Sequence, residues 1–244
     1  MKKYIKSRMI DRGIYIAGLL YIVLILFIIT QCNSTRINSF YAIYNGLWFG
    51  NIELLKLTLR CLLMGSVLFT FGYKLQEVFG DNSIYIQIRG RNRLESYWYI
   101  YKYAIYYACL VIGITFMICL GHSMMFDGSC LRDIGNVIKI VIPLLVLHFE
   151  EILFFEGLIV IAMLYEVNAA FVIYGYVLMM IICMFPKMKW MEFIPAGIAS
   201  ISRISCQVEE EITTEGLSAI VALIEMSILN LLVFVIGIIK RKRG

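Results

Sequence analysis

The stretch LSAIVALIEMSILNLLVFVIGII, residues 217–239, decides the class of fold. Its only charged residue is Glu225, and a basic run follows it at once: Lys240, Arg241, Lys242 and Arg243. A helix needs about 20 mostly apolar residues to cross the hydrocarbon core of a bilayer. Basic residues beside such a helix are typical of its cytoplasmic end. The stretch therefore predicts a membrane-spanning helix that ends in the cytoplasm.

The rest of the chain has the same character. The 244 residues are 61% hydrophobic and only 16% charged, and their mean hydropathy is +0.83. An average soluble domain is about one quarter charged, and a fold of this length leaves much of its surface in water. We therefore predict an all-α membrane protein with one transmembrane domain over residues 1–244. Its six transmembrane helices are expected at about 14–30, 54–73, 98–120, 137–164, 169–185 and 217–239.

Lysine and arginine residues near the ends of these spans predict the orientation. The richer side holds Lys2, Lys3, Lys6, Arg8, Arg12, Lys74, Arg89, Arg91, Arg93 and the run 240–243. The poorer side holds Arg36, Arg132, Lys187, Lys189 and Arg203. By the positive-inside rule the richer side is the cytoplasm, so both termini are expected there. Because orientation accounts for the net charge of +5, we expect no nucleic-acid binding.

Two segments outside the spans are also apolar. Residues 1–12 alternate basic and apolar side chains, which favours an amphipathic helix in the inner interface over a disordered basic tail. Residues 186–215 are too apolar for a plain loop, but Pro195 and Gly197 interrupt them. Here we expect a re-entrant or surface-lying pair of helices before the last span.

The loop between the second and third spans is unusual for its order of residue types. A glycine ends the preceding helix, helix-starting polar residues follow, and a short apolar stretch leads into a basic cluster. This pattern predicts a short helix just outside the membrane that docks on a soluble partner. The alternative is a basic loop that only sets the topology. The candidate residues are Glu77, Gly80, Asp81, Asn82, Ser83, Ile84, Ile86, Arg89, Arg91 and Arg93.

This pattern resembles the membrane subunits of ABC-2-type exporters. The residues that carry the resemblance are Glu77, Gly80, Ile84 to Ile88, Arg89 to Arg93, Trp98 and Lys102. The number of spans, the cytoplasmic termini, the amphipathic start and the segment before the last span are similar as well. Within that family the chain looks most like the subunits for peptide export or peptide immunity in bacteria.

The resemblance implies a role and a set of partners. The loop would be a coupling helix in a groove of a separate ATPase subunit. The chain has no GxxxxGK[ST] loop, so ATP and Mg would be bound by that subunit and the chain would not itself be an enzyme. A dimer of ATPase subunits would act on this chain and a second membrane subunit, the same or homologous. Together they would export a substrate such as an antimicrobial peptide across the bacterial cytoplasmic membrane. A non-transporting immunity or scaffold protein is an alternative.

The fourth span carries charges that lipid disfavours. An ionisable residue in mid-membrane normally faces the interior of a helix bundle or a water-filled cavity. Two interpretations fit: a polar substrate path or proton-linked site, or a structural feature, which is either a set of ion pairs that fixes helix packing or a break where the span leaves the lipid. Basic residues early in the second span are the expected counter-charges. The candidate residues are His148, Glu150, Glu151 and Glu156, with Lys56 and Arg60.

The same stretch has a second resemblance. Glu150 and Glu151 are similar to the start of the EExxxR signature of CAAX-type intramembrane proteases. The arginine of that signature would fall at Phe155, and the later histidines are missing, since the chain contains only His122 and His148. A general base without these partners does not make a hydrolase site. We therefore assign no catalytic residue and no metal ligand.

An acidic run, Glu209, Glu210 and Glu211, lies on the predicted outer face. It could attract cations or cationic peptides. A solvated turn is the alternative, and the sequence favours it.

Overall fold

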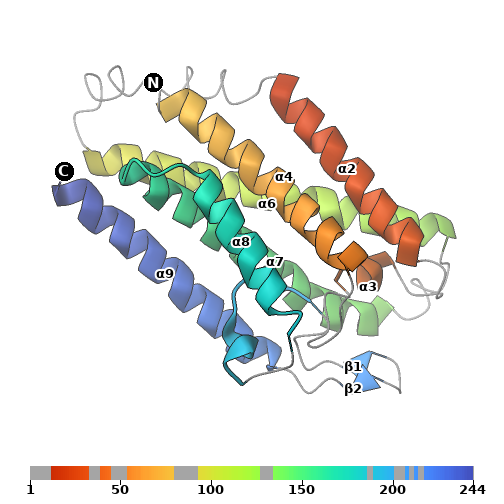
Figure 1. Cartoon of the computed structure of the whole chain (residues 1–244). Coiled ribbons are helices and arrows are strands. Elements are labelled where there is room, and N and C mark those ends of the chain that lie inside the picture. The colour runs from red at the N-terminus through yellow and green to blue at the C-terminus, as the bar shows by residue number, and fades with distance from the viewer. Residues whose placement is uncertain are drawn as a thin grey trace.

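Six helices form the framework of the protein (Figure 1). The computed structural model describes residues 12–32, 39–44, 54–79, 93–126, 134–185, 189–200, 207–208, 212–213 and 217–243. Each of the six predicted apolar runs is helical, which confirms the helical class. The helices are α2 (Arg12–Cys32), α4 (Leu54–Phe79), α6 (Arg93–Phe126), α7 (Ile134–Leu164), α8 (Ala170–Ile182) and α9 (Ala219–Arg243), and a short helix α3 (Ser39–Tyr44) follows α2.

Three of these helices are long and apolar enough to cross a membrane, within Leu54–Glu77, Tyr97–Met125 and Ala219–Lys240. Shorter apolar segments occupy Ile16–Thr30 in α2 and Ala170–Ile182 in α8. Helix α7 is not among the three, and it carries Glu150, Glu151 and Glu156 in mid-helix.

Polar residues extend some helices beyond their apolar parts. Helix α4 continues to Phe79 rather than ending near residue 73. There the Lys74 ammonium pairs with the Glu77 carboxylate at 2.7 Å, an i,i+3 pair on one helix face. Such pairs favour a further helical turn. An apolar pattern alone therefore underestimates the length of α4.

Successive long helices run in alternating directions (Figure 1). One end of the bundle, which we call the Lys240 end, contains the end of α7, the start of α8 and the end of α9. There the Lys240 ammonium lies 4.2 Å from the centroid of the Tyr165 ring, and the Tyr97 hydroxyl donates to Phe234 O at 3.1 Å. Helix α3 lies at the opposite end, which we call the α3 end.

Helix α7 packs against α4, α6, α8 and α9, and its most extensive contact is with α9. Its approach to α9 depends on Gly157, where a Cβ atom would lie 2.6 Å from Val233 Cγ1. Small residues allow this kind of close approach between helices in membranes. Aromatic rings join α4 to α6, with Phe71 stacked on Tyr103 at 5.7 Å.

The segment before α9 differs from the expected pair of helices. Its described residues form a 3₁₀ helix, η3 (Lys189–Phe193), a buried loop at 194–200 and two short antiparallel strands, β1 (Gln207–Val208) and β2 (Ile212–Thr213). Gln207 pairs with Thr213 and Val208 with Ile212. Pro195 has no N–H to donate, and Gly197 has a φ of 73°, so neither favours a continuous helix. The prediction of two helices was therefore wrong for these residues. The predicted N-terminal helix, residues 1–12, lies outside the described residues except for Arg12, which begins α2.

Candidate functional site

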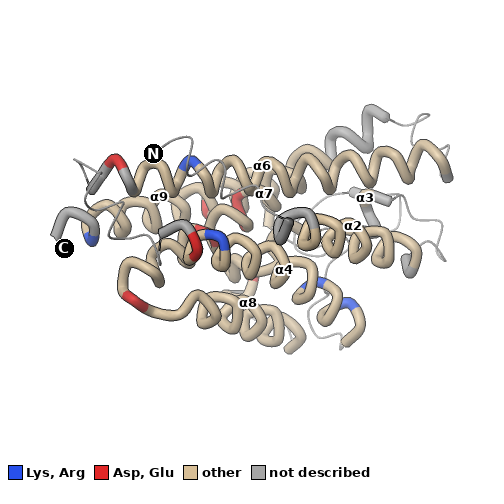
Figure 2. Tube along the Cα trace, turned by 90° about the horizontal axis from the view of Figure 1, so that it is seen from above, with Lys and Arg blue, Asp and Glu red and all other residues tan. Residues whose placement is uncertain are grey.

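The ionisable residues of α7 lie inside the bundle rather than at its ends. Figure 2 shows acidic positions on α7 enclosed among the other helices. His148, Glu151 and Glu156 are buried, and Glu150 is half-buried. Their neighbours come from different helices, so the set predicted from the sequence divides into three environments.

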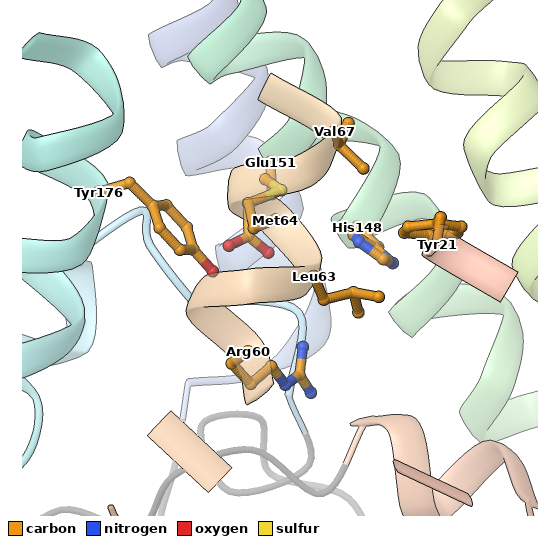
Figure 3. A pocket seen from close by; sticks show the side chains of 8 residues that line it. All are labelled: Tyr21, Arg60, Leu63, Met64, Val67, His148, Glu151 and Tyr176. Carbon is orange, nitrogen blue, oxygen red and sulfur yellow. The ribbon is translucent and has the colours of Figure 1, made fainter. Parts of the chain in front are cut away.

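The first environment is a small polar pocket between α2, α4, α7 and α8 (Figure 3). In Figure 3 the Tyr176 hydroxyl points toward the side of α4 that faces the Glu151 carboxylate, while the Arg60 guanidinium extends away from them. Helix α4 supplies one wall through residues spaced i, i+3, i+4 and i+7, which lie on one helix face. The pocket is lined by Tyr21, Arg60, Leu63, Met64, Val67, His148, Glu151 and Tyr176.

Arg60 is the basic group of this pocket. Its Nη2 donates to the backbone carbonyl of Ile43 in α3 at 2.5 Å, and the residue is 9% exposed. Arg60 and Glu151 line the same pocket, and their role as counter-charges stays a prediction. The other predicted counter-charge, Lys56, is half-buried and is not among the lining residues.

Glu151 connects α7 to the loop before α9. Its Oε1 accepts a hydrogen bond from the backbone N–H of Gly197 at 2.6 Å. Gly197 has a positive φ, and an added Cβ would lie 2.9 Å from Met180 Sδ, so a side chain there would be both strained and crowded. Sequence reasoning missed this role. The available signal was a glycine two residues after Pro195 in an apolar segment.

Tyr44 contacts the imidazole of His148, and Tyr21 lines the same pocket. The Tyr44 hydroxyl and His148 Nδ1 are hydrogen-bonded at 3.1 Å, and the two rings meet edge to face at 5.6 Å. The Tyr21 hydroxyl is hydrogen-bonded to Thr115 Oγ1 at 2.7 Å. Sequence reasoning missed these tyrosines too, although a hydroxyl inside an apolar run needs a partner when buried.

The second environment joins Glu150 to α9. Asn230 Nδ2 donates to Glu150 Oε2 at 2.5 Å and to the backbone carbonyl of Glu150 at 3.0 Å. Asn230 therefore links α9 to α7 through two hydrogen bonds. Such bonds contribute around 1 kcal/mol between helices in a membrane.

The third environment contains Glu156. This side chain is 0% exposed, and neither of its carboxyl oxygens has a hydrogen-bond partner in the described part of the chain. It is not among the residues that line the pocket. The carboxyl groups of α7 therefore do not form one cluster.

Most of the predicted coupling segment lies outside the described residues: Gly80, Asp81, Asn82, Ser83, Ile84, Ile86, Arg89 and Arg91. At its edges, Glu77 pairs with Lys74, and Arg93 is the first residue of α6. The Lys102 ammonium lies 5.3 Å from the centroid of the Trp98 ring. The acidic residues Glu209, Glu210 and Glu211 are also outside the described part.

The pocket brings polar groups together inside an apolar protein, around a space of about 10 Å³, which is roughly the size of one water. It offers a guanidinium and a carboxylate, with phenol and imidazole groups that can donate or accept hydrogen bonds. Among the described residues, no three His, Cys, Asp or Glu side chains are placed to hold a metal ion.

The chain matches no protein-family model, no curated protein and no solved structure. Its resemblance to exporter subunits is therefore a likeness of local residue pattern and predicted topology.

Proposed function

We propose that the chain is the transmembrane subunit of an ATP-driven exporter in the bacterial cytoplasmic membrane. The observation that carries the proposal is a set of buried ionisable groups around one pocket, Arg60 on α4 with His148 and Glu151 on α7, inside an otherwise apolar bundle. Charged groups are costly at membrane depth, and they typically mark the paths of substrates or ions. The pocket would receive a polar part of the substrate, with peptides as the favoured class.

Six membrane crossings with both termini in the cytoplasm are part of the proposal. The alternating helix directions support it, because they bring the end of α4, the start of α6 and the end of α9 to the same end of the bundle. These parts of the helices carry Lys74, Lys102 and Lys240. By the positive-inside rule this Lys240 end is cytoplasmic. The 13 residues of α8 span only about 20 Å at 1.5 Å per residue, so this crossing needs the flanking residues too.

Helix α4 would transmit the movement of the ATPase to the pocket. It is continuous from Leu54 to Phe79, so it joins the pocket wall to the start of the predicted coupling segment. Helix α6 begins at the other end of that segment. Closure of two ATPase subunits on ATP would push the segment and shift α4 against α7. A second membrane subunit would complete the path.

The coupling segment provides the first test. Replacing Ile84 and Ile86 by aspartate should abolish binding of the ATPase subunit and its stimulation, because two charges replace the apolar face expected to dock. Co-purification and the ATP hydrolysis rate measure the two effects. Ser83→Asp is the matched control, since it adds a charge to the same segment at a polar position. Wild-type binding and ATP hydrolysis in the double variant would rule out the coupling role.

Membrane topology provides a second test. In a variant without the native cysteines, we expect Val167→Cys to react with a membrane-impermeant maleimide only after the cells are permeabilised. Phe193→Cys should react in intact cells. Both positions are exposed, and the proposal places them on opposite sides of the membrane. Labelling of both residues from the same side would contradict the six-span arrangement.

A further inference from the structure

Glu156 differs from Glu150 and Glu151 in having no hydrogen-bond partner among the described residues. Glu150 accepts from Asn230, and Glu151 accepts from Gly197. Glu156 is fully buried, yet both of its carboxyl oxygens lack a hydrogen-bond partner within the described residues. Buried polar groups are normally hydrogen-bonded, so this exception needs an explanation.

Within the described part of the chain, the surroundings of Glu156 supply no compensating positive charge. The groups in electrostatic range of its carboxyl come from α6 and are neutral when protonated: Tyr101, Tyr103, Tyr107 and Cys109. Among the described residues of the other helices that pack on α7, the cationic groups Arg60, Lys74 and Lys240 have contacts elsewhere. On α4, Arg60 binds Ile43 O and Lys74 pairs with Glu77. On α8, Tyr176 lines the polar pocket. On α9, Lys240 lies over Tyr165, and Glu225 is a further acid.

These surroundings disfavour an ionised carboxylate. Burial of an isolated charge costs far more than burial of a neutral polar group, so such a group takes up a proton instead. The neutral carboxyl still lacks a partner, but that penalty is much smaller. The geometry is thus compatible with Glu156 as a carboxylic acid and not with Glu156 as a free anion.

We propose that Glu156 is a proton-binding site at the centre of the bundle. The carboxyl group holds its proton in this packing arrangement. It releases the proton when movement between α6 and α7 admits water or a basic partner. The site is separate from the pocket around Arg60, and it does not depend on the identity of the transported substrate or on an ATPase partner.

Infrared spectroscopy of the purified full chain in lipid nanodiscs tests the proposal. At about pH 8 an exposed glutamate is fully ionised, since its ordinary pKa is about 4.3. We expect the wild-type protein to retain the C=O stretching band of a protonated carboxyl at this pH. The band should disappear from Glu156→Gln and remain in Glu150→Gln and Glu166→Gln. Glu166 is an exposed control on the turn between α7 and α8. Absence of the band from the wild type, or its persistence in Glu156→Gln, would overturn the proposal.

Thermal unfolding of Glu156→Met gives a second, independent measurement. Methionine has a similar length and no group that needs a hydrogen bond. If Glu156 is neutral and unpaired, the unfolding midpoint should stay at the wild-type value or rise. A marked fall would mean that the carboxyl makes a stabilising polar contact, which contradicts the proposal. If Glu156→Gln does not accumulate in membranes, the spectrum of Glu156→Met replaces it as the reference.

Discussion

Replacing Arg60 by glutamine should destabilise the folded chain by about 3–5 kcal/mol, the usual cost of breaking a buried charge arrangement by removing one member. The substitution removes the positive charge from the pocket that also contains the Glu151 carboxylate. It also removes the charged donor to Ile43 O, which links α4 to α3. The measurement is the unfolding midpoint of the purified protein in detergent. Transport activity should be lost as well, because the pocket loses its cation.

The double variant Arg60→Gln, Glu151→Gln separates charge from packing. If the two groups compensate each other electrostatically, the double variant should be more stable than the sum of the single effects predicts, by about 0.5–3 kcal/mol. Lys56→Gln is the matched control on the same helix. Because Lys56 is half-buried and does not line the pocket, its loss should cost about 1 kcal/mol or less. Strict additivity of the two pocket substitutions would argue against a shared electrostatic role.

Gly157→Leu should separate α7 from α9 and destabilise the bundle by about 1–3 kcal/mol or more, the range for overpacked interiors. Even the first added carbon would lie 2.6 Å from Val233 Cγ1, well inside van der Waals contact. The same movement should break the bonds between Glu150 and Asn230, which cross this interface. The readout is the fraction of protein that remains monodisperse after heating in detergent.

A matched glycine and a compensating substitution control this experiment. Gly113→Ala meets no atom within 4 Å, so it should be neutral or stabilising by about 0.5–1 kcal/mol. Gly157→Ala should be milder than Gly157→Leu, and Val233→Ala should restore part of its loss by making room. A neutral Gly157→Leu would show that α7 and α9 do not pack as described.

The helices were predictable because the bilayer imposes a minimum length on apolar runs. All six predicted spans are helical, and their predicted ends differ from the observed ones mainly where polar residues continue the helix, as in α4. The segment at 186–215 was predicted wrongly. Its apolar composition suggested helices, but its described part forms η3, a buried loop and the short strands β1 and β2. Backbone geometry at Pro195 and Gly197 outweighed composition there.

The candidate site was predictable only for ionisable residues, because burying them at membrane depth costs free energy. Arg60, His148 and Glu151 stood out for that reason, and they share one pocket. Gly197 and Tyr44 did not stand out, because their contacts join segments far apart in the sequence. The sequence also did not show that the glutamates of α7 lie in separate environments. Residues along a helix point about 100° apart, so adjacent carboxyls such as Glu150 and Glu151 face different neighbours.

The central claim is that an ATPase subunit drives this membrane chain. It is tested most directly by purifying the tagged wild-type chain from its own membranes and measuring ATP hydrolysis after reconstitution. The account predicts that a subunit with a GxxxxGK[ST] motif co-purifies, and that its hydrolysis rate is higher with the chain than without it. Recovery of the folded chain with no nucleotide-binding subunit, together with an unchanged rate of ATP hydrolysis, would contradict it.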